Sequence, residues 1–229
     1  MARRLFELCG RDPARIFSPY CWRIRMALAH KGLAFEAVPW RFTDKQALAF
    51  ANHDKVPVLQ DGERSVADSW EIATYLDAAY PGAPSLMRGN AEPYLFISAW
   101  TDTVLHAGLA RLIVSDIPPL LDEADRAYFV QSRQARFGRT LAEVTAGREG
   151  RLPEFRASLL PLRHALRGRD FLGGAAPDYA DYIVFGGFMW ARVVSALDLL
   201  EPTDTIHGWR ERMLDLFGGM PRATPAMAG

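Results

Sequence analysis

The start of the chain passes from strand-like to helix-like spacing of its apolar residues. Residues 3–9 carry an alternating apolar pattern, which predicts a strand. A helix is expected to begin at Ser18 and Pro19, because serine offers a capping hydroxyl and proline loses no hydrogen bond at the first helical position. Gly32 is expected to end that helix, since glycine commonly follows a last helical turn. The pattern therefore opens with a strand and a helix.

The segment that follows has the order of elements of a thioredoxin-like domain. Asp61 and Gly62 form a strong turn signal, so the strands on either side are expected to pair as a hairpin. The expected elements are a strand over 33–38, a short helix over 43–53, a strand over 56–59, its hairpin partner around 65–66 and a helix capped by Ser69. With the first strand and helix this gives βαβαββα, the α/β thioredoxin plan.

The rest of the chain shows no strand pattern and is expected to form an all-helical bundle. Residues 80–84 contain two prolines and a glycine, which places a domain boundary there. The expected organisation is a thioredoxin-like domain over 1–81, a linker over 82–90 and an all-α domain over 91–229. Helices are expected over about 92–117, 122–146, 154–167, 179–199 and 204–217.

The charge balance excludes several classes of partner. Lysine plus arginine and aspartate plus glutamate are 27 each, so neither nucleic acid nor an anionic membrane is an expected partner. The longest apolar run, 183–191, is too short to span a membrane, and the N-terminus lacks the apolar stretch of a secretory signal. A small molecule or a second copy is the expected partner, and the cytoplasm is the expected location.

Metal chemistry is not expected, because the five histidines are dispersed and no histidine, cysteine and carboxylate cluster has ligand spacing. The two cysteines, Cys9 and Cys21, are too few for a disulfide framework and are typical of a reducing compartment. Cys21 lies about one helical turn after Ser18. It is therefore either an unreactive thiol or a thiol at the edge of the same site.

Three short motifs carry the candidate chemistry. Ser18 stands where the N–H groups and the dipole of a helix N-terminus stabilise an anion such as a thiolate. Val56 and Pro57 open a strand. Asp68 and Ser69 stand at a helix start, where a hydroxyl and free N–H groups suit a carboxylate and the aspartate suits an ammonium. Taken singly, each motif is also explained by ordinary capping or strand geometry.

Together these motifs resemble those of the glutathione transferase family. The string SPYCWR at 18–23 resembles the first-helix start of transferases that use serine, and also a glutaredoxin Cys-Pro-Tyr-Cys site with its first cysteine replaced by serine. The string PDYAD at 177–181 looks like the capping box and staple of the buried helix in the family's C-terminal domain. The resemblance covers essentially the whole chain.

The resemblance assigns a role to each motif. Ser18 donates a hydrogen bond to the sulfur of glutathione, which serves as co-substrate, and the thiolate attacks an apolar electrophile. The residue before a cis proline, here Val56 before Pro57, pairs its backbone with the tripeptide. The γ-glutamyl group is held by Asp68 and Ser69. The glycyl carboxylate needs a cation, for which the candidates are Lys55, Arg41 and Lys45.

The electrophile is expected to lie between the two domains, in a pocket near the helix that begins at Ser18. Aromatic residues at helical spacing more often belong to a protein core, so core packing is the alternative interpretation for each residue proposed to line this pocket. The candidate co-substrate residues are Tyr20, Trp22, Phe42, Trp100, Val104 and Leu105. The resemblance also implies a homodimer with the site near the interface.

Three other functions stay open at this point. The strings at 18–23 and 27–33 also resemble the bacterial β-etherase branch and related fungal transferases, so glutathione-dependent β-aryl ether cleavage is an alternative to conjugation. Thiol transfer through Cys21 is a second alternative. The third is a non-catalytic carrier of apolar ligands, against which the intact set of glutathione motifs argues.

Overall fold

The computed structural model of the chain describes residues 3–227. Its N-terminal part contains a four-stranded sheet in the order β2-β1-β3-β4. Strand β1 pairs in parallel with β2 and antiparallel with β3, and β4 pairs antiparallel with β3. The strands are β1 (Arg3–Leu8), β2 (Glu36–Trp40), β3 (Val58–Asp61) and β4 (Arg64–Ala67). The predicted hairpin at Asp61 and Gly62 is thereby confirmed.

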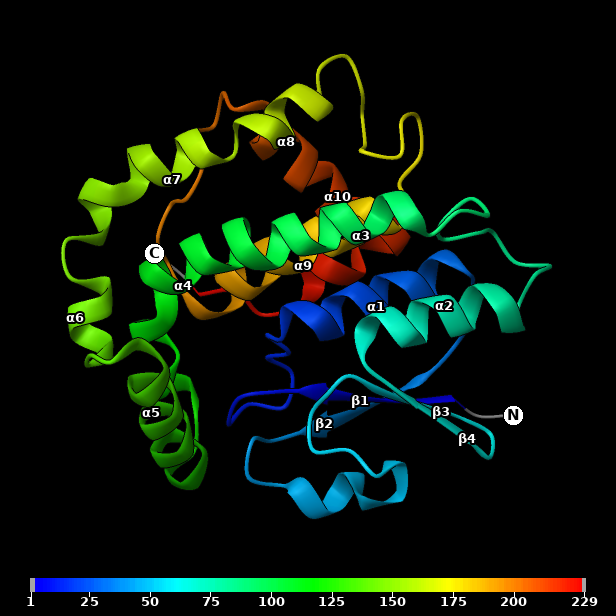
Figure 1. Cartoon of the computed structure of the whole chain (residues 1–229), viewed down its shortest axis with the longest axis horizontal. Helices are drawn as coiled ribbons and strands as arrows, with labels where there is room; N and C mark the ends of the chain where they lie inside the picture. The colour runs from blue at the N-terminus through cyan, green and yellow to red at the C-terminus, as the bar shows by residue number, and fades with distance from the viewer. Residues whose placement is uncertain (1–2, 228–229) are drawn as a thin grey trace.

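Helices α1 (Pro19–His30) and α2 (Ser69–Ala79) cover one side of this sheet, as Figure 1 shows. The segment expected to form the short second helix is a 3-10 helix, Lys45–Ala51, on the other side of the strands. The order of strands and helices is otherwise the predicted βαβαββα. The thioredoxin-like fold of this part of the chain is confirmed.

Helix α1 has the predicted ends and a deeply buried body. Ser18 caps it, and Gly32 follows it with a φ of 65°, the left-handed conformation that suits glycine. The side chains of Ile24 and Leu28 have no solvent exposure. The helix is therefore a fixed element, and its N-terminus is held at one place in the fold.

From residue 68 to 227 the chain forms only helices and connecting segments, apart from one isolated β-bridge between Phe171 and Gly174. A long helical rod runs from residue 92 to 113, with one π-helical turn in its middle. The elements are α3 (Glu92–Trp100), the π-helical turn Thr101–Leu105, α4 (His106–Ile113), α5 (Glu123–Phe137), α6 (Leu141–Thr145), α7 (Leu152–Ser158), α8 (Leu160–Ala165), α9 (Tyr179–Val194) and α10 (Thr205–Ala223). Short 3-10 turns lie at Val114–Asp116, Pro118–Leu120 and Arg148–Arg151.

Several predicted helices differ in length from those in the structure. The expected helix over 122–146 is divided at Gly138, whose φ of 65° ends α5. The helix expected over 154–167 is two short helices that meet at Leu159. The last predicted helix, 204–217, continues to Ala223 across a kink at residues 216–219, where the backbone is not helical. None of the described helices combines the length and the apolar character needed to cross a membrane.

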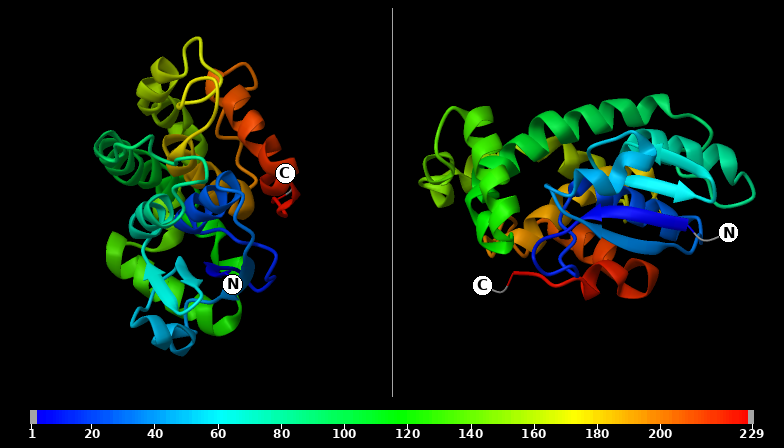
Figure 2. Two further views of the ribbon diagram at one scale, coloured as in Figure 1. Left: turned by 90° about the vertical axis from the view of Figure 1, so that its right-hand side faces the viewer. Right: turned by 90° about the horizontal axis from the view of Figure 1, so that it is seen from below.

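Helix α9 is the central buried helix and packs against α1 (Figures 1 and 2). Its predicted capping box is present: the Asp178 side chain accepts from Ala180 N at 2.9 Å, and Asp181 accepts from Asp178 N at 3.1 Å. At Gly186, a Cβ atom would stand 2.3 Å from the Pro19 carbonyl oxygen. A residue without a side chain therefore lets α9 approach the first turn of α1.

Candidate functional site

The register of the sheet brings the three predicted motifs to one end of its strands. Val58, at the start of β3, pairs with Phe6 near the carboxyl end of β1 and with Ala67 at the carboxyl end of β4. The chain leaving β1 returns to the same place, because Phe17 N donates to Leu8 O at 3.2 Å. Ser18, the segment before β3 and the residues after β4 therefore lie together at one end of the sheet.

Ser18 is an N-cap residue with extended backbone, and its Oγ accepts a hydrogen bond from Cys21 N at 3.3 Å. The side chain is nearly buried but lines a cavity at the first turn of α1. Because the oxygen accepts in this cap, its O–H remains available to donate. This position joins a hydroxyl donor to the positive end of a helix, an arrangement that stabilises an anion.

The Val56–Pro57 peptide bond is cis, as the resemblance implied. Val56 precedes β3, and within residues 3–227 its backbone N–H takes part in no hydrogen bond. An unpaired strand-like segment at this edge can pair with the backbone of an extended peptide.

Asp68, not Ser69, caps helix α2, which corrects the sequence prediction. The Asp68 carboxylate accepts from Trp70 N at 2.7 Å and is exposed, and its backbone has a φ of 74°. A non-glycine residue with such a φ is strained, and strain of this kind clusters at ligand sites. Ser69 is the first helical residue and is buried; Asp68 already accepts from the N–H groups of Trp70 and Glu71, so the Ser69 hydroxyl and the Ser69 N–H are the donors left for a ligand at this helix start.

The three candidate cations differ in their partners. Arg41 pairs with Asp122, Nε to Oδ2, at 3.3 Å. Lys45 donates to the carbonyl oxygen of Asp54 at 2.6 Å. The exposed Lys55 ammonium has no ion pair within the described part of the chain and directly precedes Val56. Lys55 is the candidate whose charge is free for a ligand.

A cavity of about 350 Å³ opens beside Ser18, between the first turn of α1 and helices α4, α5 and α9. We call it the Ser18 pocket. In Figure 1 the N-terminus of α1 points toward α4 and α5. Its apolar lining includes Leu8, Phe17, Tyr20, Phe42, Val114, Ile117, Phe129, Phe137 and Trp190, and its polar lining is Ser18, Asp102, His106, Arg111, Arg133 and Arg136.

Two of the six predicted co-substrate residues, Tyr20 and Phe42, line this pocket. Phe42 is held there by Asp125 of α5, whose carboxylate accepts from Phe42 N at 3.0 Å and from Thr43 N at 2.9 Å. Tyr20 lies edge-on to His106, with ring centroids 5.6 Å apart.

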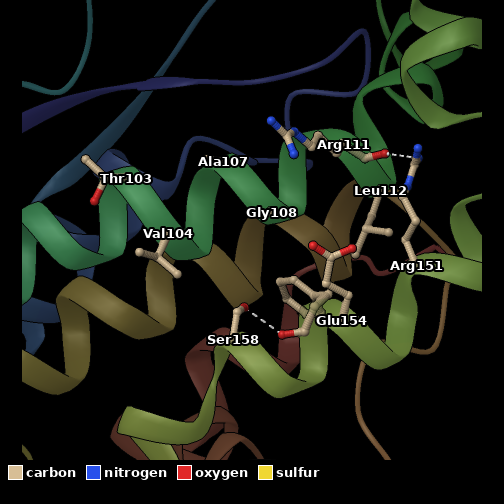
Figure 3. Close-up of a pocket in the computed structure, with 10 residues that line it drawn as sticks. Thr103, Val104, Ala107, Gly108, Arg111, Leu112, Arg151, Glu154 and Ser158 are labelled. Carbon is tan, nitrogen blue, oxygen red and sulfur yellow. Dashed lines mark hydrogen bonds between the residues drawn. The ribbon is translucent and has the colours of Figure 1, made fainter.

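The other four predicted co-substrate residues lie elsewhere. Trp22 has no solvent exposure and donates from Nε1 to Ile16 O at 2.8 Å, and Trp100 is partly buried against the core. Leu105 is fully buried against α9. Val104 lines a separate cavity between α4 and α7, which Figure 3 shows. The reason is helical spacing: positions 102, 106, 110 and 114 face the Ser18 pocket, whereas 104 and 105 project from other sides.

Sequence reasoning missed the polar side of the pocket. The Asp102 Oδ1 atom lies 2.6 Å from Arg23 Nη2 and 3.2 Å from His106 Nδ1. Burial lowers the pKa of His106, so at neutral pH this contact is a hydrogen bond from a neutral ring to a carboxylate. Although partial burial opposes ionisation, bonds from His106 and Arg23 hold the pKa of Asp102 below its usual range. The i, i+4 spacing of Asp102 and His106 is the signal that could have found this pair.

Cys21 does not reach the pocket edge. Its side chain has no solvent exposure, and burial raises the pKa of the thiol to about 12, with the charge of Glu7 adding to the effect. Of the two interpretations of Cys21, this burial favours the unreactive thiol, while thiol chemistry at Cys21 stays an untested alternative. Cys9 is likewise buried, and burial raises its pKa to about 11.

Family models and known proteins match this architecture. The model "Glutathione S-transferase, N-terminal domain" matches residues 15–84, and "Glutathione S-transferase, C-terminal domain" matches residues 94–216. The chain belongs to the glutathione S-transferase family. Its members are transferases, so the family recognised from the sequence motifs is confirmed, whereas the serine-type and β-etherase branches stay predictions.

Two rice proteins and a fungal structure illustrate the similarity. "Probable glutathione S-transferase GSTU6" of Oryza sativa subsp. japonica is 29% identical over 93% of this chain and 84% of its own length. "Probable glutathione S-transferase GSTU1" of the same subspecies is 41% identical over 69% of this chain and 62% of its own length. A glutathione S-transferase of Ceriporiopsis subvermispora, CsGST63524, solved in complex with glutathione, superposes with a TM-score of 0.83 at 20% identity, covering 98% of this chain and 99% of its own.

No group of three or more histidine, cysteine, aspartate or glutamate side chains among residues 3–227 is arranged to hold a metal ion. The site described above offers hydroxyl, backbone and cationic groups instead.

Proposed function

We propose that the chain is a serine-type glutathione S-transferase in which the Ser18 hydroxyl donates a hydrogen bond to the sulfur of glutathione. The observation that carries the proposal is the position of Ser18, which caps α1 and lines a largely apolar cavity. A thiol with a pKa of about 8.5 is mostly protonated at neutral pH. A hydroxyl donor and a helix N-terminus both favour the thiolate and so raise the population of the nucleophile.

The rest of glutathione would lie along the sheet edge. The Val56 backbone would pair with the peptide, and Asp68 and Ser69 would receive the ammonium and carboxylate of the γ-glutamyl group. Lys55 is our choice for the glycyl carboxylate, because Arg41 and Lys45 already contact other groups. With these assignments the polar tripeptide would lie outside the Ser18 pocket, and its sulfur would lie at the mouth of the pocket.

The electrophile would occupy the Ser18 pocket. The thiol proton leaves to solvent, the sulfur forms a bond to the electrophilic carbon, and the leaving group departs with the bonding pair. Ser18 acts as a donor and not as a base, so its hydroxyl stabilises charge on sulfur without taking up the proton. An aryl ether would follow the same steps with an aryloxide as leaving group.

Turnover of 1-chloro-2,4-dinitrobenzene with glutathione tests the proposal, with Ser18→Ala as the variant and Ser18→Thr as the hydroxyl-keeping control. We expect kcat to fall by about 10- to 100-fold in Ser18→Ala, with little change in the KM for glutathione and with partial activity kept in Ser18→Thr. Equal kcat in wild type and Ser18→Ala would contradict the role of Ser18. A wild type that binds glutathione but conjugates nothing would contradict conjugation and favour ether cleavage or a carrier.

The family resemblance also implies a homodimer in the cytoplasm, and both points stay predictions. Light scattering of the purified protein measures the first. A mass near 25.6 kDa, that of one chain, would contradict the dimer.

A further inference from the structure

The wall of the Ser18 pocket opposite α1 carries a concentration of positive charge. Arg111 of α4 and Arg133 and Arg136 of α5 all line this cavity, together with the aromatic rings of Phe42 and Phe129. Arg111 and Arg136 are exposed at its mouth, and Arg133 is half-buried in its wall. A pocket for a purely apolar compound does not require three guanidinium groups.

These arginines have no carboxylate partner within residues 3–227. Asp102 is the one carboxylate that lines the pocket, and it is already bonded to Arg23, which lies outside the lining. Figure 3 shows the Arg111 side chain extending away from Glu154 and Arg151, while its backbone carbonyl accepts from Arg151 at 2.8 Å. The positive charge at this wall is therefore not neutralised by the protein.

Arg133 is the most constrained of the three. Its guanidinium lies 4.8 Å from the centroid of Phe129 and 5.7 Å from that of Phe42, and its Nη1 donates to Ser132 Oγ at 3.0 Å. Burial lowers the pKa of Arg133, and the nearby charge of Arg136 lowers it further. Positively charged groups removed from water are normally paired with an anion. An anion placed here would relieve both the lost hydration and the repulsion between the two arginines.

We propose that the Ser18 pocket takes an aromatic electrophile that carries an anionic group, a carboxylate or a sulfonate, and that Arg111, Arg133 and Arg136 bind that group. The aromatic body would lie against Phe42 and Phe129, with its reactive carbon toward Ser18. A pocket of about 350 Å³ accommodates a small aromatic acid of this kind. Arginine suits the role because its planar fork binds carboxylates and sulfonates with two parallel hydrogen bonds.

This inference rests on the proposed transferase function, so its test has one arm that needs turnover and one that does not. The turnover arm compares 4-chloro-3,5-dinitrobenzoate with neutral 1-chloro-2,4-dinitrobenzene, each corrected for its uncatalysed rate with glutathione. The variants are Arg133→Gln, Arg111→Gln and Arg133→Lys, and the control is Arg167→Gln, an exposed arginine that does not line the pocket.

We expect wild type to favour the benzoate in kcat/KM and Arg133→Gln to lose about tenfold of that preference, while the KM for glutathione stays unchanged. Arg111→Gln should lose a smaller share because it is exposed, Arg133→Lys should keep part of the preference, and Arg167→Gln should keep all of it. A preference that is absent in wild type or equal in Arg133→Gln would overturn the inference. A raised KM for glutathione would assign the arginines to glutathione's own carboxylates and overturn it as well.

The binding arm uses fluorescence titration with 8-anilinonaphthalene-1-sulfonate and with N-phenyl-1-naphthylamine, which has the same rings without the sulfonate. We expect the sulfonate to bind wild type about tenfold more tightly than the neutral dye, with the difference lost in Arg133→Gln. Equal affinities in wild type would overturn the inference. A charge preference in binding together with no turnover of either electrophile would support the anion site and contradict the transferase function, so the two failures are distinguishable.

Discussion

Alkylation of the native protein shows whether Cys21 can take part in thiol chemistry. Burial raises the pKa of this thiol to about 12, and its side chain has no solvent exposure. At about pH 7.5 such a thiol would be ionised to about 3 parts in 100,000, against about one part in ten for an ordinary thiol of pKa about 8.5. The reactive thiolate is therefore about three thousandfold scarcer, before the lack of access is counted.

Iodoacetamide labelling followed by intact mass provides the assay, with free glutathione as the reference thiol. We expect neither Cys21 nor Cys9 to be labelled while glutathione reacts to completion, and both to be labelled once the protein is unfolded in denaturant. In parallel, Cys21→Ser should keep conjugation activity, because the bond to Ser18 Oγ comes from the backbone N–H of residue 21. Rapid single labelling of native protein that disappears in Cys21→Ser would refute this reasoning and revive thiol transfer.

Three further residues give predictions. Asp125→Ala removes the acceptor of Phe42 N, so we expect a higher KM for the electrophile and an unchanged KM for glutathione. The free energy of unfolding in urea should fall by about 2–4 kcal/mol. A KM for the electrophile equal to that of wild type would contradict this. Asp181→Ala leaves four N–H donors unpaired, two of them buried, including Trp209 Nε1 at 2.8 Å, and should cost about 3–5 kcal/mol. A loss under about 1 kcal/mol would count against the network. Burial lowers the pKa of His106, so the unfolded chain binds a proton at this ring more readily than the folded protein, and stability should fall as the pH drops from about 7 to 5. His106→Gln should make Tm fall less steeply over this pH range. The same dependence of Tm on pH in wild type and His106→Gln would contradict this.

Local chemistry made the three motifs of the N-terminal part predictable. Ser18 with Pro19 marks a helix start by itself, and the turn at Asp61 and Gly62 fixes the hairpin that leads to Asp68. Strands β3 and β4 are adjacent in sequence, but β1 also pairs with β3 although β2 lies between them in sequence, and it is this pairing, expected from the thioredoxin-like order of elements, that brings the three motifs together. The error at Asp68 and Ser69 is one residue, because both side chains can cap a helix.

The Ser18 pocket depends on contacts between elements that are distant in sequence. Arg133 lines the pocket from α5, and Asp125, eight residues earlier on the same helix, ties α5 to Phe42 N and Thr43 N, which are more than 80 residues away in sequence. The spacing of Val104 is helical, but spacing alone does not say which face of a helix meets which neighbour. Aromatic content pointed to Trp22 and Trp100, and these belong to the core and its margin.

The ionisation of bound glutathione tests the central claim most directly. The ultraviolet absorbance of the thiolate, titrated against pH with wild type and Ser18→Ala saturated with glutathione, reports the pKa of the bound thiol. We expect that pKa to lie at least about one unit below the solution value in wild type and to return toward it by about one unit in Ser18→Ala, as the loss of one charge-assisted hydrogen bond requires. The same pKa in both proteins would contradict the assignment of Ser18 as the residue that stabilises the thiolate.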